Sequence, residues 1–360
     1  MKRIFLFSAF LVLLFSSAAQ TDVGYEIKVT FKPFKNQYIY LGHYFGKTYP
    51  IIDSALLNEK SEAIFKGDGN LNGGIYLIGY PKKTGFFEVL VDKQQRFSIT
   101  ADTATIGSSI KFENSSDNVL FNHYQQFMTG KGKEINKLKD SYKTSTSKKD
   151  SAAIREKLIK LDEDIAAFRN DIIKNYPGNI LTALLMTMKE PALTGRLKNP
   201  KTKEDSLASW QYYKDHFWDD VSFYDGRIAY TTFFEEKLDK YFNQVVVPHP
   251  DSVIKELDWM LGTATINLEM TRFLLIKFVN RYLNQKYMWE DAVFLYLFEK
   301  YFAQKEHSWL TAAGKKVITD RAYSLMANIM GTPASDIELP DSTGAMKSMF
   351  AEKGNFTMVI

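Results

Sequence analysis

The sequence contains no cysteine among its 360 residues. The thiolate is the nucleophile of thiol–disulfide exchange and a frequent ligand of zinc. Its absence excludes thiol catalysis, disulfides and thiolate-ligated zinc. Histidine is scarce too, since five occur and none are spaced as His-x-x-x-His or His-Glu-x-x-His, which would put two imidazoles on one helical face. We therefore predict no catalytic residue, no metal site and no cofactor.

A long hydrophobic run is also missing. The apolar stretch Ile4–Phe15 is shorter than the roughly 20 residues of a membrane-spanning helix. It follows Lys2 and Arg3 and ends in small residues. This is the pattern of a secretory signal peptide, which we predict over residues 1–19 with cleavage before Gln20. No cysteine at that position offers a lipid attachment. We expect a soluble product in the periplasm or exported cell envelope, without a membrane span.

The charge is nearly balanced, with 46 basic and 42 acidic residues and a formal net charge of +4. Nucleic-acid-binding proteins concentrate Lys and Arg on one face or stripe. The densest basic stretch, Lys131–Lys149, is interleaved with Ser, Thr, Asp and Glu, and we interpret it as a solvated linker or helix face. Gly130–Lys133 lacks the spacing of a phosphate-binding loop and is predicted to be an ordinary loop. No nucleic-acid partner is expected.

Residues 20–114 have the pattern of an antiparallel β-sandwich. Tyr25–Phe31 alternates apolar and polar residues with a period of two, which places one face on a core. Turn signals such as Asp68-Gly69-Asn70 and Asn72-Gly73-Gly74 separate short segments of the same kind. These further strands are predicted at Tyr38–Gly42, Ala63–Gly67, Ile75–Ile78, Phe86–Val91 and Arg96–Thr100.

Residues 115–330 change to helical periodicity and predict an all-α domain. Ile154, Leu158, Leu161, Ile165 and Phe168 recur at three- and four-residue steps and so share one helix face. Further helices are predicted from residue 115 to about residue 127, at Ile180–Met188, Thr232–Phe242, Asp251–Leu261, Phe273–Lys286, Glu290–Ala303 and Ala312–Ile329.

The segment Gly331–Ile360 resembles the opening of the periplasmic thiol–disulfide oxidoreductases of the thioredoxin and peroxiredoxin superfamily. A turn at Asp341–Gly344 follows an alternating stretch, and Phe356–Ile360 matches the family's first strand. The resemblance rests on the pattern G-x-x-A-P-D-hydrophobic-x-L-x-D-x-x-G, with Ser335 in place of the proline. The matching residues are Gly331, Ala334, Asp336, Ile337, Leu339, Asp341 and Gly344.

In that family the first strand leads directly to a Cys-x-x-Cys pair, and this sequence ends just before it. The preceding regions are similar to the β-rich and helical domains of unknown function in Bacteroidetes-type members. The similar features include Asp53-Ser54 before the strand Phe65-Lys66-Gly67, and His216–Asp219 in the helical part. The resemblance implies a chain truncated within the thioredoxin-like domain at residues 331–360.

A cluster of aromatic and polar residues follows position 210 and is the best candidate for a ligand or partner groove. Helix–helix packing is the favoured explanation of such a cluster, and if the chain has a groove for a ligand or peptide, we expect it here. The candidate groove residues are Tyr213, His216, Phe217, Trp218, Asp219 and Tyr224.

The sequence thus predicts an α+β multidomain protein that is the non-catalytic front of an exported thioredoxin-like oxidoreductase. An alternative from another class remains open, in which the chain is a complete periplasmic module that binds an envelope protein or ligand. In either case the expected protein partner is an envelope protein or a second copy, as a homodimer.

Overall fold

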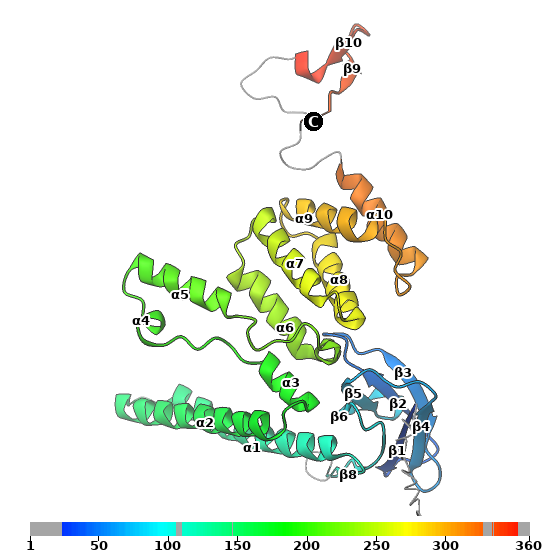
Figure 1. Cartoon of the computed structure of the whole chain (residues 1–360), viewed down its shortest axis with the longest axis vertical. Helices are drawn as coiled ribbons and strands as arrows, with labels where there is room; N and C mark the ends of the chain where they lie inside the picture. Colours follow the sequence, from blue (N-terminus) through cyan, green and yellow to red (C-terminus); the bar gives the residue numbers. More distant parts are fainter. Residues whose placement is uncertain (1–23, 106–109, 146, 327–332, 334, 352–360) are drawn as a thin grey trace, which may run out of the picture.

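The structure is a computed structural model that describes residues 24–105, 110–145, 147–326, 333 and 335–351. The predicted signal peptide at residues 1–19 and the predicted strand Phe356–Ile360 lie outside the described residues. Within them, an N-terminal β-rich part is followed by a helical part, which confirms the predicted α+β class (Figure 1). No helix of this described part combines the length and apolarity that crossing a membrane requires.

Eight strands form two four-stranded sheets, which together we call the sandwich. Their order is β4-β1-β7-β8 in one sheet and β3-β2-β5-β6 in the other. The bounds are β1 Tyr25–Lys32, β2 Tyr38–His43, β3 Ile51–Leu56, β4 Glu62–Gly67, β5 Gly74–Gly79, β6 Phe86–Val91, β7 Arg96–Asp102 and β8 Lys111–Glu113, with a short 3-10 helix η1 at Pro81–Lys83.

Alternating side chains from both sheets build the core of the sandwich. Ile27, Val29 and Phe31 of β1 are buried, while the residues between them face outward, as the period of two predicts. Phe31 packs edge-on against Phe87 from the other sheet, with ring centroids 5.6 Å apart. The pairing is antiparallel except between β1 and β7, which run parallel from Glu26 opposite Arg96 onward.

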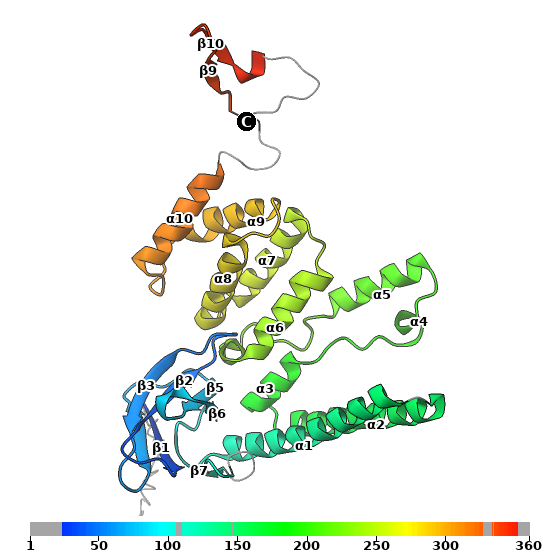
Figure 2. The ribbon, with the colours of Figure 1, turned by 180° about the vertical axis from the view of Figure 1, so that it is seen from behind.

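The helical region extends over residues 116–326. Figures 1 and 2 show α1 and α2 side by side, extending away from the sandwich. The bounds are α1 Ser116–Thr144, α2 Lys148–Asn175, α3 Ile180–Thr187, α4 Gly195–Lys198, α5 Lys203–Asp215, α6 Thr232–Lys240, α7 Pro250–Ala264, α8 Leu268–Leu283, α9 Glu290–Leu297 and α10 Ala312–Met326, with a 3-10 turn η2 at Gly226–Tyr230 and π-helical turns η3 at Tyr241–Val245 and η4 at Phe298–Phe302.

The prediction of a loop at Gly130–Lys133 is wrong, because these residues lie within α1. Both glycines face open space, so neither contributes a contact that would hold a loop. The helix continues through them because its other face packs on α2, where Phe127 and Phe168 stack with centroids 4.0 Å apart and Lys131 pairs with Asp164 at 2.8 Å. Tertiary packing outweighs the cost of a helical glycine, which is about 1 kcal/mol.

One buried side chain joins α1 to the edge of the second sheet. Asn118 is fully buried, and its Oδ1 accepts a hydrogen bond of 2.7 Å from the backbone N–H of Leu90 in β6. Its Nδ2 donates to the Leu90 carbonyl, also at 2.7 Å. The amide thus satisfies two backbone groups of an edge strand that has no further strand beside it in the described sheet.

The loop after β2 joins the sandwich to the helical core. The Phe45 ring lies 5.1 Å from Phe273 of α8, and the N–H of Gly46 donates to the Ala229 carbonyl at 3.2 Å. The next N–H, of Lys47, donates to the Glu235 carboxylate of α6 at 2.5 Å. Gly46 has a φ of +59°, and a Cβ there would overlap the Glu235 carboxylate. The close approach therefore requires glycine.

An arginine makes the third connection. Arg227 of η2 pairs with Asp92, which follows β6, at 2.7 Å and with Asp225 at 2.6 Å. These carboxylates raise the pKa of the Arg227 guanidinium above its ordinary value. Together with Asn118 and the Gly46 loop, this pair holds the sandwich and the helical region together. We call residues 24–326, as far as they are described, the body.

Residues 335–351 form a small antiparallel hairpin of β9 Glu338–Pro340 and β10 Met346–Ser348, followed by a 3-10 turn η5 at Met349–Ala351. The turn between the strands lies at Asp341–Gly344, as the sequence predicts, and Gly344 has a φ of +85°. The Asp341 carboxylate accepts hydrogen bonds from the N–H groups of Thr343 at 2.8 Å and Ala345 at 3.1 Å. The side chains of Leu339 and Met346 are exposed.

Candidate functional site

The predicted aromatic cluster lies at the end of α5 and in the loop after it. Phe217 and Trp218 belong to the main helical core, where the Phe217 ring lies 4.9 Å from Tyr241 and the Trp218 ring 5.4 Å from Phe223. A capping box, in which Thr202 and Asp205 exchange side-chain to backbone bonds, fixes the start of α5. The helix therefore delivers these two aromatic rings to the core.

The polar members of the cluster stay on the surface. His216 Nδ1 lies 2.6 Å from Asp219 Oδ2, and the His216 ring packs on Tyr212 at 4.3 Å. An exposed His–Asp pair of this kind contributes little stability.

The six predicted residues do not line one groove. Trp218 and Asp219 border a shallow cavity of about 460 Å³ together with Trp259. Tyr213 instead donates its hydroxyl to Glu190 at 2.9 Å. Tyr224 is 56% exposed, and its carbonyl accepts from Asn267 in the loop before α8. The structure thus brings two of the predicted residues to one cavity and Tyr224 to another, of about 230 Å³, and the groove itself stays a prediction.

A buried lysine lies beneath this cluster and was not recognised in the sequence. Lys237 of α6 is 8% exposed, and its ammonium group lies 4.9 Å from the Phe217 ring centroid. It donates to the carbonyl of Lys189. Burial lowers the pKa of Lys237 to about 8, although Glu190 and Asp220 oppose that shift. In the sequence, the burial of Lys237 was indicated by its spacing, which places it on the same helix face as Phe234 and Leu238.

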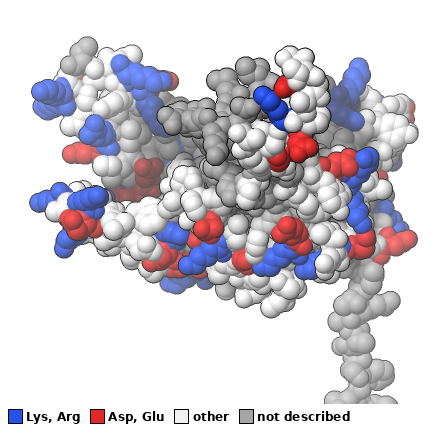
Figure 3. Space-filling model, turned by 90° about the horizontal axis from the view of Figure 1, so that it is seen from above, with Lys and Arg blue, Asp and Glu red and all other residues white. Residues whose placement is uncertain are grey.

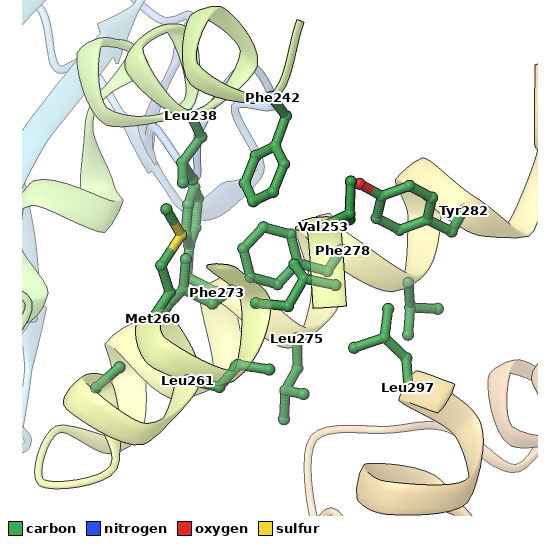
Figure 4. Packing of buried hydrophobic residues seen from close by; sticks show 14 of the residues in the cluster. Leu238, Phe242, Val253, Met260, Leu261, Phe273, Leu275, Phe278, Tyr282 and Leu297 are labelled. Carbon is green, nitrogen blue, oxygen red and sulfur yellow. The ribbon is translucent and has the colours of Figure 1, made fainter. Parts of the chain in front are cut away.

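A larger cavity, of about 660 Å³, opens between α6, η3, the start of α7, α8 and the loop before α9. We call it the α6–α8 cavity. Phe242 and Phe278 form an apolar wall, with ring centroids 5.4 Å apart (Figure 4). Tyr282 also lines the cavity, and burial raises its pKa to about 12. Small-molecule sites have volumes of roughly 300–1,000 Å³ and mostly apolar walls.

The π-helical turn η3 shapes one side of this cavity. Phe242 and Asn243 both belong to it and both line the cavity. A π turn rotates the following side chains away from the positions an α-helix would give them, and such turns occur often at functional sites. The sequence pattern Thr232–Phe242 predicts the helix and gives no sign of the π turn.

Charged residues border the α6–α8 cavity in pairs. Lys277 pairs with Glu235 at 2.7 Å, and Arg281 approaches Asp239 at 3.4 Å. The Glu290 carboxylate accepts from the backbone N–H of Lys286 at 2.5 Å and so caps the loop before α9. Among the described residues that line the cavity there is no Ser, Thr or His. The side chains that line it include carboxylates, amides, cationic groups and aromatic rings.

Both signs of charge are also mixed on the surface. The face in Figure 3 shows Lys and Arg interspersed with Asp and Glu. Over the residues that the structure describes, no group of three or more His, Asp or Glu side chains is placed to hold a metal ion.

Residues 189–328 match the family model of a domain of unknown function, DUF5106. No curated protein and no solved structure matches the chain. The matched segment begins just after α3 and contains all residues that line the two cavities. The helical core and its cavities are thus features of the part that is similar to this family.

Proposed function

We propose that the chain is the non-catalytic N-terminal portion of an exported thioredoxin-like thiol–disulfide oxidoreductase. In this proposal the body carries a redox domain whose first elements are the hairpin. The proposal rests on the resemblance of Gly331–Ile360 to the opening of such domains and on the absence of cysteine from the chain.

The exposed apolar side chains of the hairpin are the observation that carries the proposal. Leu339 is 61% exposed, and Met346 and Phe350 are exposed to a similar degree. A two-stranded hairpin is marginally stable alone in water and needs further strands or a helix to cover an apolar face. A thioredoxin-like domain that continues from this hairpin would provide that cover.

The construction of the body supports a carrying role. Its two parts are joined by the buried amide of Asn118, the ring of Phe45 and the ion pairs of Arg227. Such a joint leaves little freedom between the sandwich and the helical region, so that a domain attached after α10 would be held on one rigid support.

The proposal predicts that the 360-residue chain alone has no thiol–disulfide activity. Exchange requires thiolate attack on a disulfide sulfur, and the chain has no sulfur nucleophile except thioethers. The measurement is reduction of insulin disulfides with dithiothreitol, and we expect the uncatalysed rate. The same chain extended by a thioredoxin-like domain with its Cys-x-x-Cys should be active.

Two controls sharpen this assay. The extended chain with both cysteines replaced by serine should return to the background rate. The redox domain without the body should keep its chemistry but change its KM for a protein substrate. Activity of the 360-residue chain above background, or identical kinetics with and without the body, would contradict the proposed role.

The alternative function, a complete binding module, is favoured by the α6–α8 cavity. The nucleotide sequence after codon 360 separates the two. Continuation into an aromatic pair and Cys-x-x-Cys supports the carrying role, whereas a stop codon supports the binding module.

A further inference from the structure

The α6–α8 cavity has an imbalance between hydrogen-bond donors and acceptors that points to a class of ligand. All three of its carboxylates have partners within the chain. Glu235 accepts from Lys277 and from the N–H of Lys47. Asp239 accepts from the Lys47 ammonium group and from Arg281. These oxygens are therefore largely satisfied, as is the Glu290 carboxylate that caps the loop.

The cationic groups are less fully used. A guanidinium carries five N–H donors. Arg281 uses Nη1 for the 3.4 Å contact with Asp239 and Nη2 for a 2.6 Å bond to Asn243, so that N–H groups of both terminal nitrogens are left over, while its Nε–H is buried and has no acceptor in the described structure. The Lys286 ammonium group has no carboxylate partner among the described residues. Three cations and three carboxylates line the cavity, and Lys47, which lies outside the lining, takes up part of Asp239.

The apolar wall lies next to these donors. Arg281 stacks over the ring of Phe242 at 5.6 Å and over that of Tyr282 at 5.9 Å. A ligand that contacts this wall therefore has the guanidinium edge and Lys286 within the same cavity. Tyr287, which is exposed, and Trp289, which is half-buried, border the loop side.

We propose that the α6–α8 cavity binds a small organic carboxylate with an apolar body of about one aromatic ring. The carboxylate lies among the unused donors of Arg281 and Lys286, and the apolar body packs against Phe242 and Phe278. The same chemistry occurs in a free aromatic acid and in the C-terminal residue of a peptide. This inference goes beyond the carrying role and does not depend on it, because a support needs no small-molecule site.

The test titrates 3-phenylpropionate into the 360-residue protein by isothermal titration calorimetry. We expect a Kd of about 1 mM or tighter. The uncharged 3-phenylpropanamide has the same ring and chain length and should bind roughly tenfold more weakly or worse, because it lacks the charge-assisted bonds. The peptide Ala-Ala-Phe, with a free or an amidated C-terminus, distinguishes a peptide end from a free acid.

Lys286→Gln is the variant that tests the location. Its side chain is exposed in the loop before α9, so the fold should survive, and affinity for the acid should fall roughly tenfold. Lys305→Gln, an exposed lysine that does not line the cavity, is the matched control and should bind like the parent. Equal affinity for acid and amide, equal affinity of Lys286→Gln and the parent, or no binding of any probe at about 10 mM would overturn the proposal.

Discussion

The body and the hairpin show two opposite ways in which a segment can be attached. In the body, polar groups that cross between the sandwich and the helical region are buried and paired, as with Asn118 and Leu90. In the hairpin, hydrogen bonds close the turn at Asp341, while apolar side chains face outward. The difference indicates that the body can fold with its own contacts, whereas the hairpin depends on a cover that the described residues do not supply.

The largest effect should come from Asn118→Ala. The change removes both partners of the Leu90 backbone and leaves a buried N–H and C=O unsatisfied, each of which costs about 1–3 kcal/mol. We expect a loss of about 2–5 kcal/mol in the free energy of unfolding, measured by urea denaturation.

Asn122→Ala is the matched control for Asn118→Ala. Asn122 lies one turn further along α1 and makes a single bond of 3.2 Å to Ile110. It should lose about 1 kcal/mol or less. Equal losses for the two variants would mean that the joint does not depend on the buried amide.

A smaller, pH-dependent effect should come from Lys237→Met. Burial lowers the pKa of Lys237 from its ordinary 10.5 to about 8 in the folded protein. Between these pH values the unfolded chain binds one more proton than the folded chain, so the free energy of unfolding rises with pH. Relative to Lys237→Met, the free energy of unfolding of the parent should rise by about 1–3 kcal/mol between pH 8 and pH 10.5. Below pH 8 the difference between the two proteins should change much less.

The measurement is urea denaturation of parent and variant across this pH range, and the difference between them removes the contribution of the tyrosines. Lys305→Met, at an exposed position, should show no such difference from the parent. A parent whose stability relative to Lys237→Met falls as pH rises would show that the ammonium form is favoured in the folded protein by its bond to the Lys189 carbonyl and by the Phe217 ring.

The smallest effect should come from deleting residues 331–360. Leu339 is 61% and Met346 62% exposed, so their removal uncovers little apolar surface of the body. We expect a change below about 1 kcal/mol, a few degrees in Tm by calorimetry. A larger fall would show that this segment packs on the body and is not an independent beginning of another domain.

The sequence predicted the sandwich better than its edges. Period-two alternation located β1, β2, β4, β5, β6 and β7 to within a residue or two. It missed β3, because Ile51, Ile52 and Leu56 are exposed and so break the alternation that burial of one face produces. The parallel pairing of β1 with β7 could not be predicted from the sequence either, because it depends on which strands share a sheet.

In the helical region, apolar periodicity predicted most helices, and α5 was missed although Thr202 and Asp205 have the spacing of a capping box. The error at Gly130–Lys133 has the opposite cause, since local propensity suggested a break that packing on α2 prevents. Sequence signals thus failed where the partner surface, rather than the segment itself, determines the structure.

The α6–α8 cavity could not be predicted from the sequence. Its residues come from three stretches of the chain, 235–243, 248–253 and 277–290, and Phe242, Phe278 and Tyr282 have the spacing of ordinary core residues. The π turn η3 and the loop before α9 both contribute residues to its lining. In contrast, the aromatic cluster after position 210 was conspicuous in the sequence because its residues are adjacent, but only Phe217 and Trp218 of its six residues belong to the core.

The position of Gly46 makes the relative orientation of the two parts of the body depend on the absence of a side chain. Any larger residue there would act as a wedge between the loop and Glu235 of α6, while the cores on either side keep their full complement of side chains. A larger side chain at position 46 would therefore strain one of the three connections between the sandwich and the helices, without changing the core of either part. A series of variants with side chains of increasing size at position 46 would change the angle between the sandwich and the helical region in graded steps.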